Sequence, residues 1–363
     1  MKEVVKIRHH GNGEEKNINS KDKLFFASDY MEGTHPLILQ RLVETNLVKS
    51  AGYGLDEFSE SARNRIRAAC GVPEADVFFL AGGTQTNAVM IDALLRPYQG
   101  VMAAESGHIS THEAGAIEFG GHKVLVLPQH DGKVSAEDIA GCIRAYREDE
   151  NRDHLVMPGM VYISQPTEFG TLYSLEELRA ISGICRENRI PLYLDGARLA
   201  YALACPENDA ALPDIAALCD VFYIGGTTWG ALFGEAVVIP QHDCIPHLFT
   251  IIKQHGALLA KGRIAGIQFD TLFTDDLYGR IGRTAIEAAE RIRQALEEKG
   301  YTFAFHSPTN QIFILLEKTQ AAALSEKVEM GFWENVDDSH TVMRIATSWA
   351  THSEEAERLI KIL

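Results

Sequence analysis

The chain has 363 residues, 46% of them hydrophobic and 23% charged, which is the composition of an ordinary globular protein with a large core. It has 50 acidic side chains against 34 basic ones, and a formal net charge of −16 at pH 7. This balance excludes nucleic acids and anionic membrane surfaces as general partners, because both would repel the chain as a whole.

The cysteines and the N-terminus indicate a reduced compartment. The six cysteines are scattered without a CxxC pair, which favours free thiols over disulfides or a zinc site. The first stretch, MKEVVKIRHHGNGEEKNINSKDKLFF, has no apolar run typical of a secretion signal, and no later run is long enough to cross a membrane. We therefore expect a soluble protein of the cytoplasm.

Taken in chain order, the elements predict an α/β fold. Residues 1–23 are polar and rich in Gly and Asn, which indicates a loosely held N-terminal arm. Next come strand-like and helical runs in alternation: ADVFFLAGG, TQTNAVMIDALLRPY, GVMAAE, STHEAGAIEFG, HKVLVLP, SAEDIAGCIRAYRED, HLVMPGMVYIS, SLEELRAISGICREN, IPLYLD and CDVFYIGG. Two of these helices begin with Ser followed by an acid three residues later, as N-caps do. The alternation predicts crossover units and a mainly parallel sheet.

Beyond GEAVVIP the pattern changes to long helices and short mixed strands. The predicted helices are IPHLFTIIKQHGALLAKGR and GRTAIEAAERIRQALEEKG, and the strands after them are NQIFILLE and TVMRIATSWA. We place a boundary near residue 265. Residues 24–265 would then form a large domain, and residues 266–363 a smaller α+β domain.

The stretch FFLAGGTQTN, residues 78–87, predicts a strand, a glycine turn and a helix. Such a turn exposes unpaired N–H groups at the positive end of the helix, where an acidic chain can capture a phosphate locally. The stretch matches neither the P-loop nor the dinucleotide motif. A crossover turn without a ligand is the alternative.

The stretch PLYLDGARLA ends an apolar strand at Asp195, with Arg198 three residues later. Active sites of parallel sheets lie at the carboxyl ends of the strands, so Asp195 should face a cleft. It could hold a proton on a ring nitrogen, while Arg198 could neutralise it or bind a carboxylate. A structural Asp–Arg pair that caps a turn is the alternative.

The stretch GHISTHEAG carries His108, His112 and Glu113 between a strand and a helix. HxxxHE is not the HExxH motif and no third ligand is evident, so we predict no metal site. An imidazole at a strand end can instead stack on a flat cofactor or move a proton. His112 is equally consistent with a helix residue that faces a cavity or solvent.

Arg344 lies within an apolar run, TVMRIATSWA, and needs a partner if it is buried. A substrate carboxylate would serve, and so would a salt bridge between the lobes. The turn-like stretches FASDYMEG and AGYGLDEF contribute Ser28 and Tyr53, which taken singly indicate nothing.

The order of these pieces resembles the low-specificity L-threonine aldolase family, in the β-eliminating lyase group of fold-type I pyridoxal-phosphate (PLP) enzymes. The resemblance runs from about residue 24 to the end, and DGAR followed by GGT..GALFGEA carries it most specifically. It implies a mostly parallel seven-stranded sheet, a small C-terminal domain, and a homodimer or homotetramer with active sites at a subunit interface. It implies cleavage of L-threonine, allo-threonine or a related β-hydroxy-α-amino acid to glycine and an aldehyde.

The resemblance also implies residue roles. His108 would stack on the cofactor ring near the substrate hydroxyl, Asp195 would pair with the ring nitrogen, and Arg198 would contact the phenolic oxygen or the substrate. The phosphate would be held by Gly83, Thr84, Gln85 and Thr227. The substrate carboxylate would be held by Ser28 and Arg344, and the neighbouring subunit would contribute Tyr53 and Lys261.

The chain departs from the family pattern at two catalytic positions. Glu168 stands where many members have a His near the β-hydroxyl, and its pKa would have to be raised by burial for it to take that proton near neutrality. Thr228 stands where the family has the lysine that binds the cofactor covalently. The lysines that follow, Lys253 and Lys261, do not come directly after that strand end.

Three hypotheses follow from this pattern. The first is a threonine-aldolase-type lyase. The second is a catalytically impaired or non-catalytic homologue that binds PLP without a covalent bond, because of Thr228. The third is a related β-eliminating lyase that acts on another amino acid.

Overall fold

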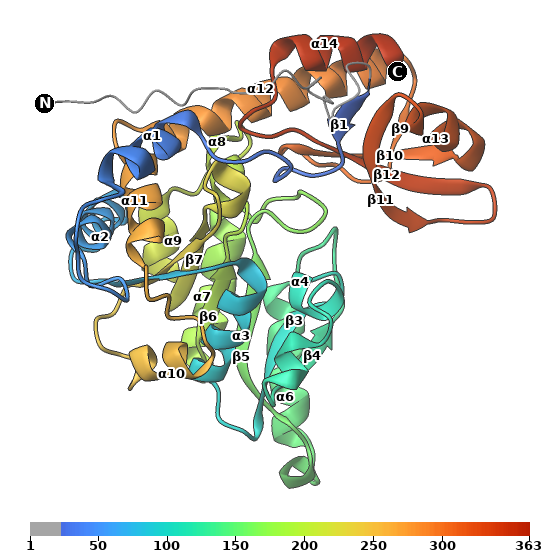
Figure 1. Ribbon diagram of the computed structural model, residues 1–363. Coiled ribbons are helices and arrows are strands. Elements are labelled where there is room, and N and C mark those ends of the chain that lie inside the picture. Colours follow the sequence, from blue (N-terminus) through green and yellow to red (C-terminus); the bar gives the residue numbers. More distant parts are fainter. Residues whose placement is uncertain (1–22) are drawn as a thin grey trace, which may run out of the picture.

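The computed structural model describes residues 23–363 (Figure 1), so the predicted arm lies outside the described residues except for Lys23. The larger lobe is built on a seven-stranded sheet of order β2-β8-β7-β6-β5-β3-β4. Its strands are β2 (Asp76–Leu80), β3 (Gln99–Ala104), β4 (Lys123–Leu127), β5 (Met157–Ser164), β6 (Leu192–Asp195), β7 (Val221–Gly225) and β8 (Glu235–Ile239). Only β8 pairs antiparallel with its neighbours, β2 and β7. The prediction of a mostly parallel seven-stranded α/β sheet is confirmed.

Helices cover both faces of this sheet, because alternate residues of its apolar strands point to opposite sides. On β5, Val161 and Ile163 join one core cluster while Met160 and Tyr162 join the other. The first face is covered by α1 (Pro36–Thr45), α2 (Glu57–Cys70), α6 (Ala136–Glu148), α7 (Leu175–Asn188), α8 (Leu199–Ala204), α9 (Leu212–Leu218) and α11 (Arg263–Leu272). The second is covered by α3 (Gly83–Leu94), α4 (His108–Thr111), α5 (Ala116–Phe119) and α10 (Leu248–Gln254).

The smaller lobe has a five-stranded sheet of order β1-β11-β12-β10-β9 and its own apolar core. Its strands are β1 (Leu24–Phe26), β9 (Thr302–Phe303), β10 (Gln311–Glu317), β11 (Val328–Asn335) and β12 (His340–Ala346), and its helices are α12 (Leu277–Glu298), α13 (Lys318–Ser325) and α14 (Ser353–Ile362). The long α12 contributes Ile281 to the core of the large lobe and Ile292 to that of the small lobe. Figure 1 shows the chain after β1 crossing from the small sheet to α1.

Two predicted helix starts are confirmed, but two predicted helices are interrupted and α12 begins at Leu277, ahead of the predicted Gly282. Both predicted Ser N-caps are confirmed, with complete capping boxes at Ser135 and Ser174. The prediction of one long helix after GEAVVIP is wrong: α10 ends at Gln254 and α11 begins only at Arg263, with Gly256 between them at a φ of +66°. A left-handed glycine just past a helix end stops the helix by capping it. The stretch STHEAGAIEFG is also interrupted, because α4 ends at Thr111 and α5 begins only after its N-cap Gly115, which has a φ of +72°.

Two short 3-10 turns complete the described elements, η1 (Arg152–His154) and η2 (Thr227–Trp229). Within residues 23–363, no helix is both long enough and apolar enough to cross a bilayer.

Candidate active site

The segments that follow neighbouring strands of the large sheet meet around one cavity of about 340 Å³. His108 comes after β3, Glu168 after β5, and Asp195 is the last residue of β6. Thr228 lies in η2, directly after β7. Glu235 begins β8 and reaches the same edge because β8 runs antiparallel to β7. The cavity thus lies at the carboxyl ends of the parallel strands, where parallel sheets bind ligands.

The N-terminus of α3 opens into this cavity. Its N-cap, Gly82, has no side chain to cap the helix, and the N–H groups of Gly83 and Thr84 have no partner within residues 23–363. A Cβ placed on Gly82 would meet nothing within 4 Å, so the space in front of the turn is open. Free N–H groups at the start of a three-turn helix suit an anion.

Gln85 does not line the cavity. Its Oε1 accepts a hydrogen bond from the N–H of Ala81 at 3.2 Å, so the side chain folds back over the turn. The backbone N–H of Gln85 has no partner within the described chain, as with Gly83. If Gln85 contributes to anion binding, it does so through its backbone.

Asp195 is buried and accepts four hydrogen bonds. Its Oδ1 accepts from Tyr223 Oη at 2.5 Å and from the N–H of Ala197 at 3.0 Å. Its Oδ2 accepts from Tyr162 Oη at 2.6 Å and from Asn87 Nδ2 at 3.1 Å. A carboxylate has about four lone-pair sites, and these four donors occupy all of them. A donor from a ligand must therefore displace one of the four donors or share a site with it.

Glu168 combines burial with two hydrogen bonds. Its Oε1 accepts from the N–H of His108 and from Ser164 Oγ, both at 2.8 Å. Burial raises the pKa of Glu168 to about 7, although the hydrogen bonds to its carboxylate act to lower it. A carboxyl group with a pKa near neutrality can accept and return a proton at physiological pH. A raised pKa is the condition for Glu168 to take the β-hydroxyl proton near neutrality.

His108 is paired with an acid that the sequence analysis considered only as a metal ligand. Its Nδ1 lies 2.8 Å from Glu113 Oε1. Burial lowers the pKa of His108, but the bond to Glu113 and the nearby charges of Asp195 and Glu168 outweigh burial and raise it. Within residues 23–363, no three His, Cys, Asp or Glu side chains are arranged to hold a metal ion.

Glu235 was not predicted as a site residue, although it lies in the stretch GALFGEA that carries the resemblance to the family. It accepts from the N–H of Gly226 at 3.1 Å and from Thr227 Oγ1 at 2.8 Å, and burial raises its pKa to about 8. An acid at the start of an apolar strand was a detectable feature. Its place in the site depends on β8 being antiparallel, which the local pattern does not reveal.

We expect Glu235→Gln to remove a pH-dependent loss of stability. An acid with a folded-state pKa of about 8 and an ordinary value of 4.5 ionises in the unfolded chain first, so stability falls as pH rises between these values. The free energy of unfolding of the variant should exceed that of the wild type by a margin that grows by roughly 3 kcal/mol from pH 5 to pH 8. Urea unfolding between pH 5 and pH 8 measures this margin, and the substitution Glu187→Gln at an exposed position is the control. If the difference in unfolding free energy stays constant from pH 5 to pH 8, Glu235 is ionised throughout this range.

Thr228 faces the cavity from the turn after β7. Its Oγ1 donates to the carbonyl of Ala197 at 2.6 Å, and its own carbonyl accepts from Tyr201 Oη at 2.8 Å. No lysine is among the described residues that line the cavity. Lys253 instead lies 4.6 Å from the ring centre of Tyr53, and Lys261 is exposed. Thr227 Oγ1 is engaged within the turn, by Glu235 and by the N–H of Gly234.

A second hollow of about 320 Å³ shares His108, Glu168 and Arg198 with this cavity and extends to the small lobe. Arg198 is paired with the buried Asp29, through Nε at 2.7 Å and Nη2 at 3.0 Å. Tyr30 also lines both, and the remaining residues of the hollow are His112, Gln311, Phe332, Trp333 and Arg344. The hollow therefore joins the two lobes at the mouth of the cavity.

Arg344 forms no ion pair within residues 23–363, so the alternative of a lobe–lobe salt bridge is wrong. It donates to the carbonyl of Ala27 at 2.8 Å and to Gln311 Oε1 at 3.1 Å, and its Nε is buried without a partner. Burial and the charge of Arg198 lower its pKa. Ser28 Oγ is also buried without a partner but lines neither hollow. A buried guanidinium with a free donor favours an anionic ligand.

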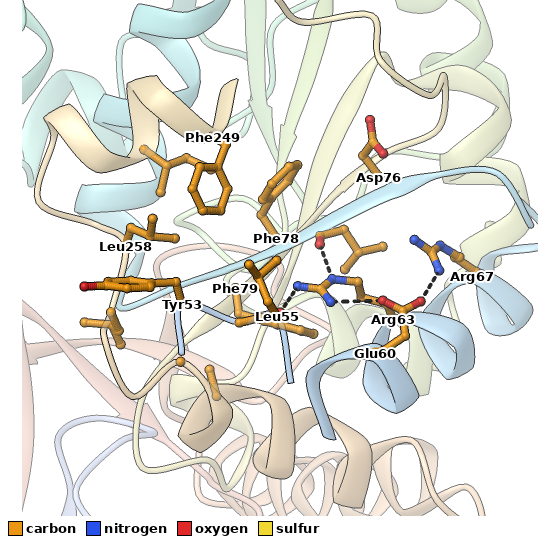
Figure 2. A pocket seen from close by; sticks show the side chains of 16 residues that line it. Tyr53, Leu55, Glu60, Arg63, Arg67, Asp76, Phe78, Phe79, Phe249 and Leu258 are labelled. Atoms are coloured by element: carbon orange, nitrogen blue, oxygen red, sulfur yellow. Dashed lines mark hydrogen bonds and ion pairs between the residues drawn. The ribbon is translucent and has the colours of Figure 1, made fainter. Parts of the chain in front are cut away.

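Tyr53 lies in a separate pocket of about 210 Å³, beside Phe249 and Leu258 (Figure 2). The charged groups there are already paired: Glu60 accepts from both Arg63 and Arg67, and Asp76 accepts from the N–H of Asp243 and lies 2.7 Å from His242 Nδ1. Arg63 also donates to the carbonyls of Gly54 and Val77. With no free acid or base, this pocket does not compete as a catalytic site.

Comparisons with known proteins identify one matching family and several similar proteins. The chain matches the family model of β-eliminating lyases over residues 26–320. It is 30% identical over 339 residues to a low specificity L-threonine aldolase of Pseudomonas aeruginosa, and the match covers 93% of this chain and 96% of the relative. A threonine aldolase structure from Leishmania major has a TM-score of 0.90 and 43% identity, covering 93% of this chain and 98% of that one. An aspartate aminotransferase of Thermus thermophilus, at a TM-score of 0.68 and 16% identity, covers 94% and 91% and is alike in fold alone.

Proposed function

The chain belongs to the β-eliminating lyase family, and we propose that it is a threonine-aldolase-like lyase. Its reaction would break the Cα–Cβ bond of L-threonine, allo-threonine or a related β-hydroxy-α-amino acid and release glycine and an aldehyde. The observation that carries the proposal is one cavity that combines the free N-terminus of α3, the buried Asp195, and Glu168 with a pKa of about 7.

The groups around the cavity fit PLP, which this reaction requires. The uncapped N–H groups of Gly83 and Thr84 suit its phosphate, and the open space in front of Gly82 leaves room for it. Asp195 offers a negative charge to the ring nitrogen, and His108 lines the cavity between Asp195 and the mouth. Arg344, with its unpartnered Nε, suits the α-carboxylate of an amino acid.

In the proposed reaction, bound PLP supplies an electron sink for the pair released from the Cα–Cβ bond. Glu168, when ionised, accepts the proton of the β-hydroxyl, so that the β-oxygen can form the carbonyl of the aldehyde as the bond breaks. Cα then gains a proton and becomes the methylene carbon of glycine. Arg344 orients the substrate through its carboxylate, and the bidentate pair with Asp29 fixes the guanidinium of Arg198 at the mouth.

Thr228 favours a second candidate function, that of a protein that holds PLP without a covalent bond. No lysine of the described chain lines the cavity, so the cofactor would be retained by its phosphate and ring contacts alone. An amino acid substrate would then have to condense with free cofactor and its product would leave by hydrolysis, which slows turnover. Borohydride reduction followed by peptide mass analysis tests this candidate, because a cofactor fixed to a lysine would exclude it.

We also propose that the active form is a homodimer or homotetramer. Among the described residues that line the cavity, the only arginine is Arg198, and Asp29 already neutralises it. A phosphate dianion at α3 would therefore have no unpaired arginine or lysine among the described residues that line the cavity. Tyr53 and Lys261 are exposed and line neither hollow, so they could reach a phosphate only in a neighbouring copy. Light scattering that finds a monomer with bound PLP would contradict this.

The proposed function is tested by adding PLP and a panel of β-hydroxy-α-amino acids and measuring glycine release. Threonine and allo-threonine should give glycine and acetaldehyde in equal amounts, above the rate with PLP alone. The control is Arg344→Gln, which should raise KM for the amino acid because it removes the charge that pairs with the carboxylate. Absence of glycine from every member of the panel, with PLP bound, would contradict the threonine-aldolase function and leave the binding function and a lyase acting on another amino acid.

A further inference from the structure

Glu113, in the turn between α4 and α5, is a buried acid that the proposed reaction does not use. Its side chain is fully shielded from solvent. One oxygen, Oε1, receives Asn87 Nδ2 at 2.6 Å and lies 2.8 Å from His108 Nδ1, while Oε2 is buried without a partner. Burial of an acid with so few donors is costly unless a positive charge offsets it. His108 is the adjacent group that can carry one.

Asn87, on α3, connects this acid to a second one. Its Nδ2 donates to Glu113 and also to Asp195 Oδ2 at 3.1 Å, and its Oδ1 accepts from Tyr193 Oη at 2.9 Å. Both N–H groups and the carbonyl of the amide are therefore in use. The opposite amide orientation would point the carbonyl at two carboxylates, so these contacts fix the orientation.

We propose that Glu113, held by Asn87, is a positioning residue that fixes His108 with its proton on Nδ1 and leaves Nε2 as the ring nitrogen available to a ligand. The same chain of contacts joins the imidazole to Asp195, the group assigned to the far end of the cofactor ring. The proposal rests on the proposed function only for the identity of that ligand. The contacts themselves belong to the protein alone.

The charges around His108 favour its protonated form. Glu113, Glu168 and Asp195 are the acids that act on it, and His112, with its ring centre 5.7 Å away, is the nearby base. Among these acids, Glu113 alone touches the imidazole ring, because Glu168 accepts from the backbone N–H of His108 instead. A carboxylate on Nδ1 selects the tautomer and makes the ring more basic, as it does for metal-bound and catalytic histidines.

The test is an NMR titration of His108 in the complete, cofactor-free protein labelled with 15N and 13C at histidine. The wild type should titrate above the ordinary value for histidine, and Glu113→Gln should lower the pKa of His108 by about 1 to 2 units, as expected when an opposite charge in contact is removed. Glu113→Asp keeps the charge and should fall between them. Glu118→Gln, the same change at an exposed position on α5, should leave the titration unchanged. Equal titrations of the wild type and Glu113→Gln would overturn the proposal.

A measurement on the wild type alone avoids dependence on the folding of variants, and a second one tests the contact of Asn87. The 15N shifts of the wild type above the pKa of His108 should show the Nδ1–H tautomer, and the Nε2–H tautomer would refute the proposal. In wild-type and Glu113→Gln protein labelled with 15N at asparagine, one side-chain amide proton of Asn87 should differ in shift, and if neither does, Asn87 does not bridge the acids. No step uses PLP or an amino acid, so these results stand whether or not glycine is released.

Discussion

Replacing Thr228 by lysine is expected to give a protein that binds PLP covalently and turns over faster. The side chain at this position faces the cavity from the turn after β7, and the cavity of about 340 Å³ leaves room for a longer one. An amine held beside the cofactor aldehyde converts a bimolecular exchange into one within the site, so glycine release from threonine should rise by about a hundredfold or more. A new absorbance band in the visible range and a borohydride-fixed adduct at residue 228 are the measurements.

The matched control for this substitution is Thr228→Met. It adds a chain of similar length without the amine and removes the same hydrogen bond to the carbonyl of Ala197. It should give neither the absorbance band nor the adduct. Should the lysine variant behave like the methionine variant, the assignment of residue 228 to the position of the family lysine would be wrong, while the fold and the family would be unaffected.

The sequence predicted those parts of the site that follow from local pattern. Asp195 ends an apolar strand and Gly83 begins a helix after another, and in a parallel sheet both reach the same edge. The resemblance to a known family then selected Thr228 and Glu168 from many polar residues in loops. Their chemical roles remain proposals, although the cavity brings these residues together.

What the sequence could not predict depends on contacts between distant residues. Asn87 and Asp195 are 108 positions apart, and no spacing rule connects an amide on α3 with an acid at the end of β6. Glu235 enters the site only because β8 reverses direction. The pKa of Glu168 had to be raised for its proposed role, and the burial that raises it comes from the folded structure.

Asp195→Asn is expected to cause a large loss of activity. The substitution removes the negative charge assigned to the ring nitrogen, and in the Thr228→Lys background it should lower kcat for threonine cleavage by about a hundredfold or more, the usual effect of losing one positioned electrostatic group. It should also cost about 1–3 kcal/mol of stability. The new amide would point its N–H groups at the N–H of either Ala197 or Asn87, and neither N–H can accept a hydrogen bond.

Tyr162→Phe separates charge from hydrogen bonding in this prediction. It removes one donor to Asp195 and keeps the carboxylate, with Tyr223, Asn87 and the N–H of Ala197 still in place. If charge is what Asp195 supplies, Tyr162→Phe should lower kcat far less than Asp195→Asn, even where thermal unfolding shows similar losses of stability. Equal losses of kcat would mean that the hydrogen-bonded network, rather than the charge at the ring nitrogen, sets the rate, because only the network is changed in both variants.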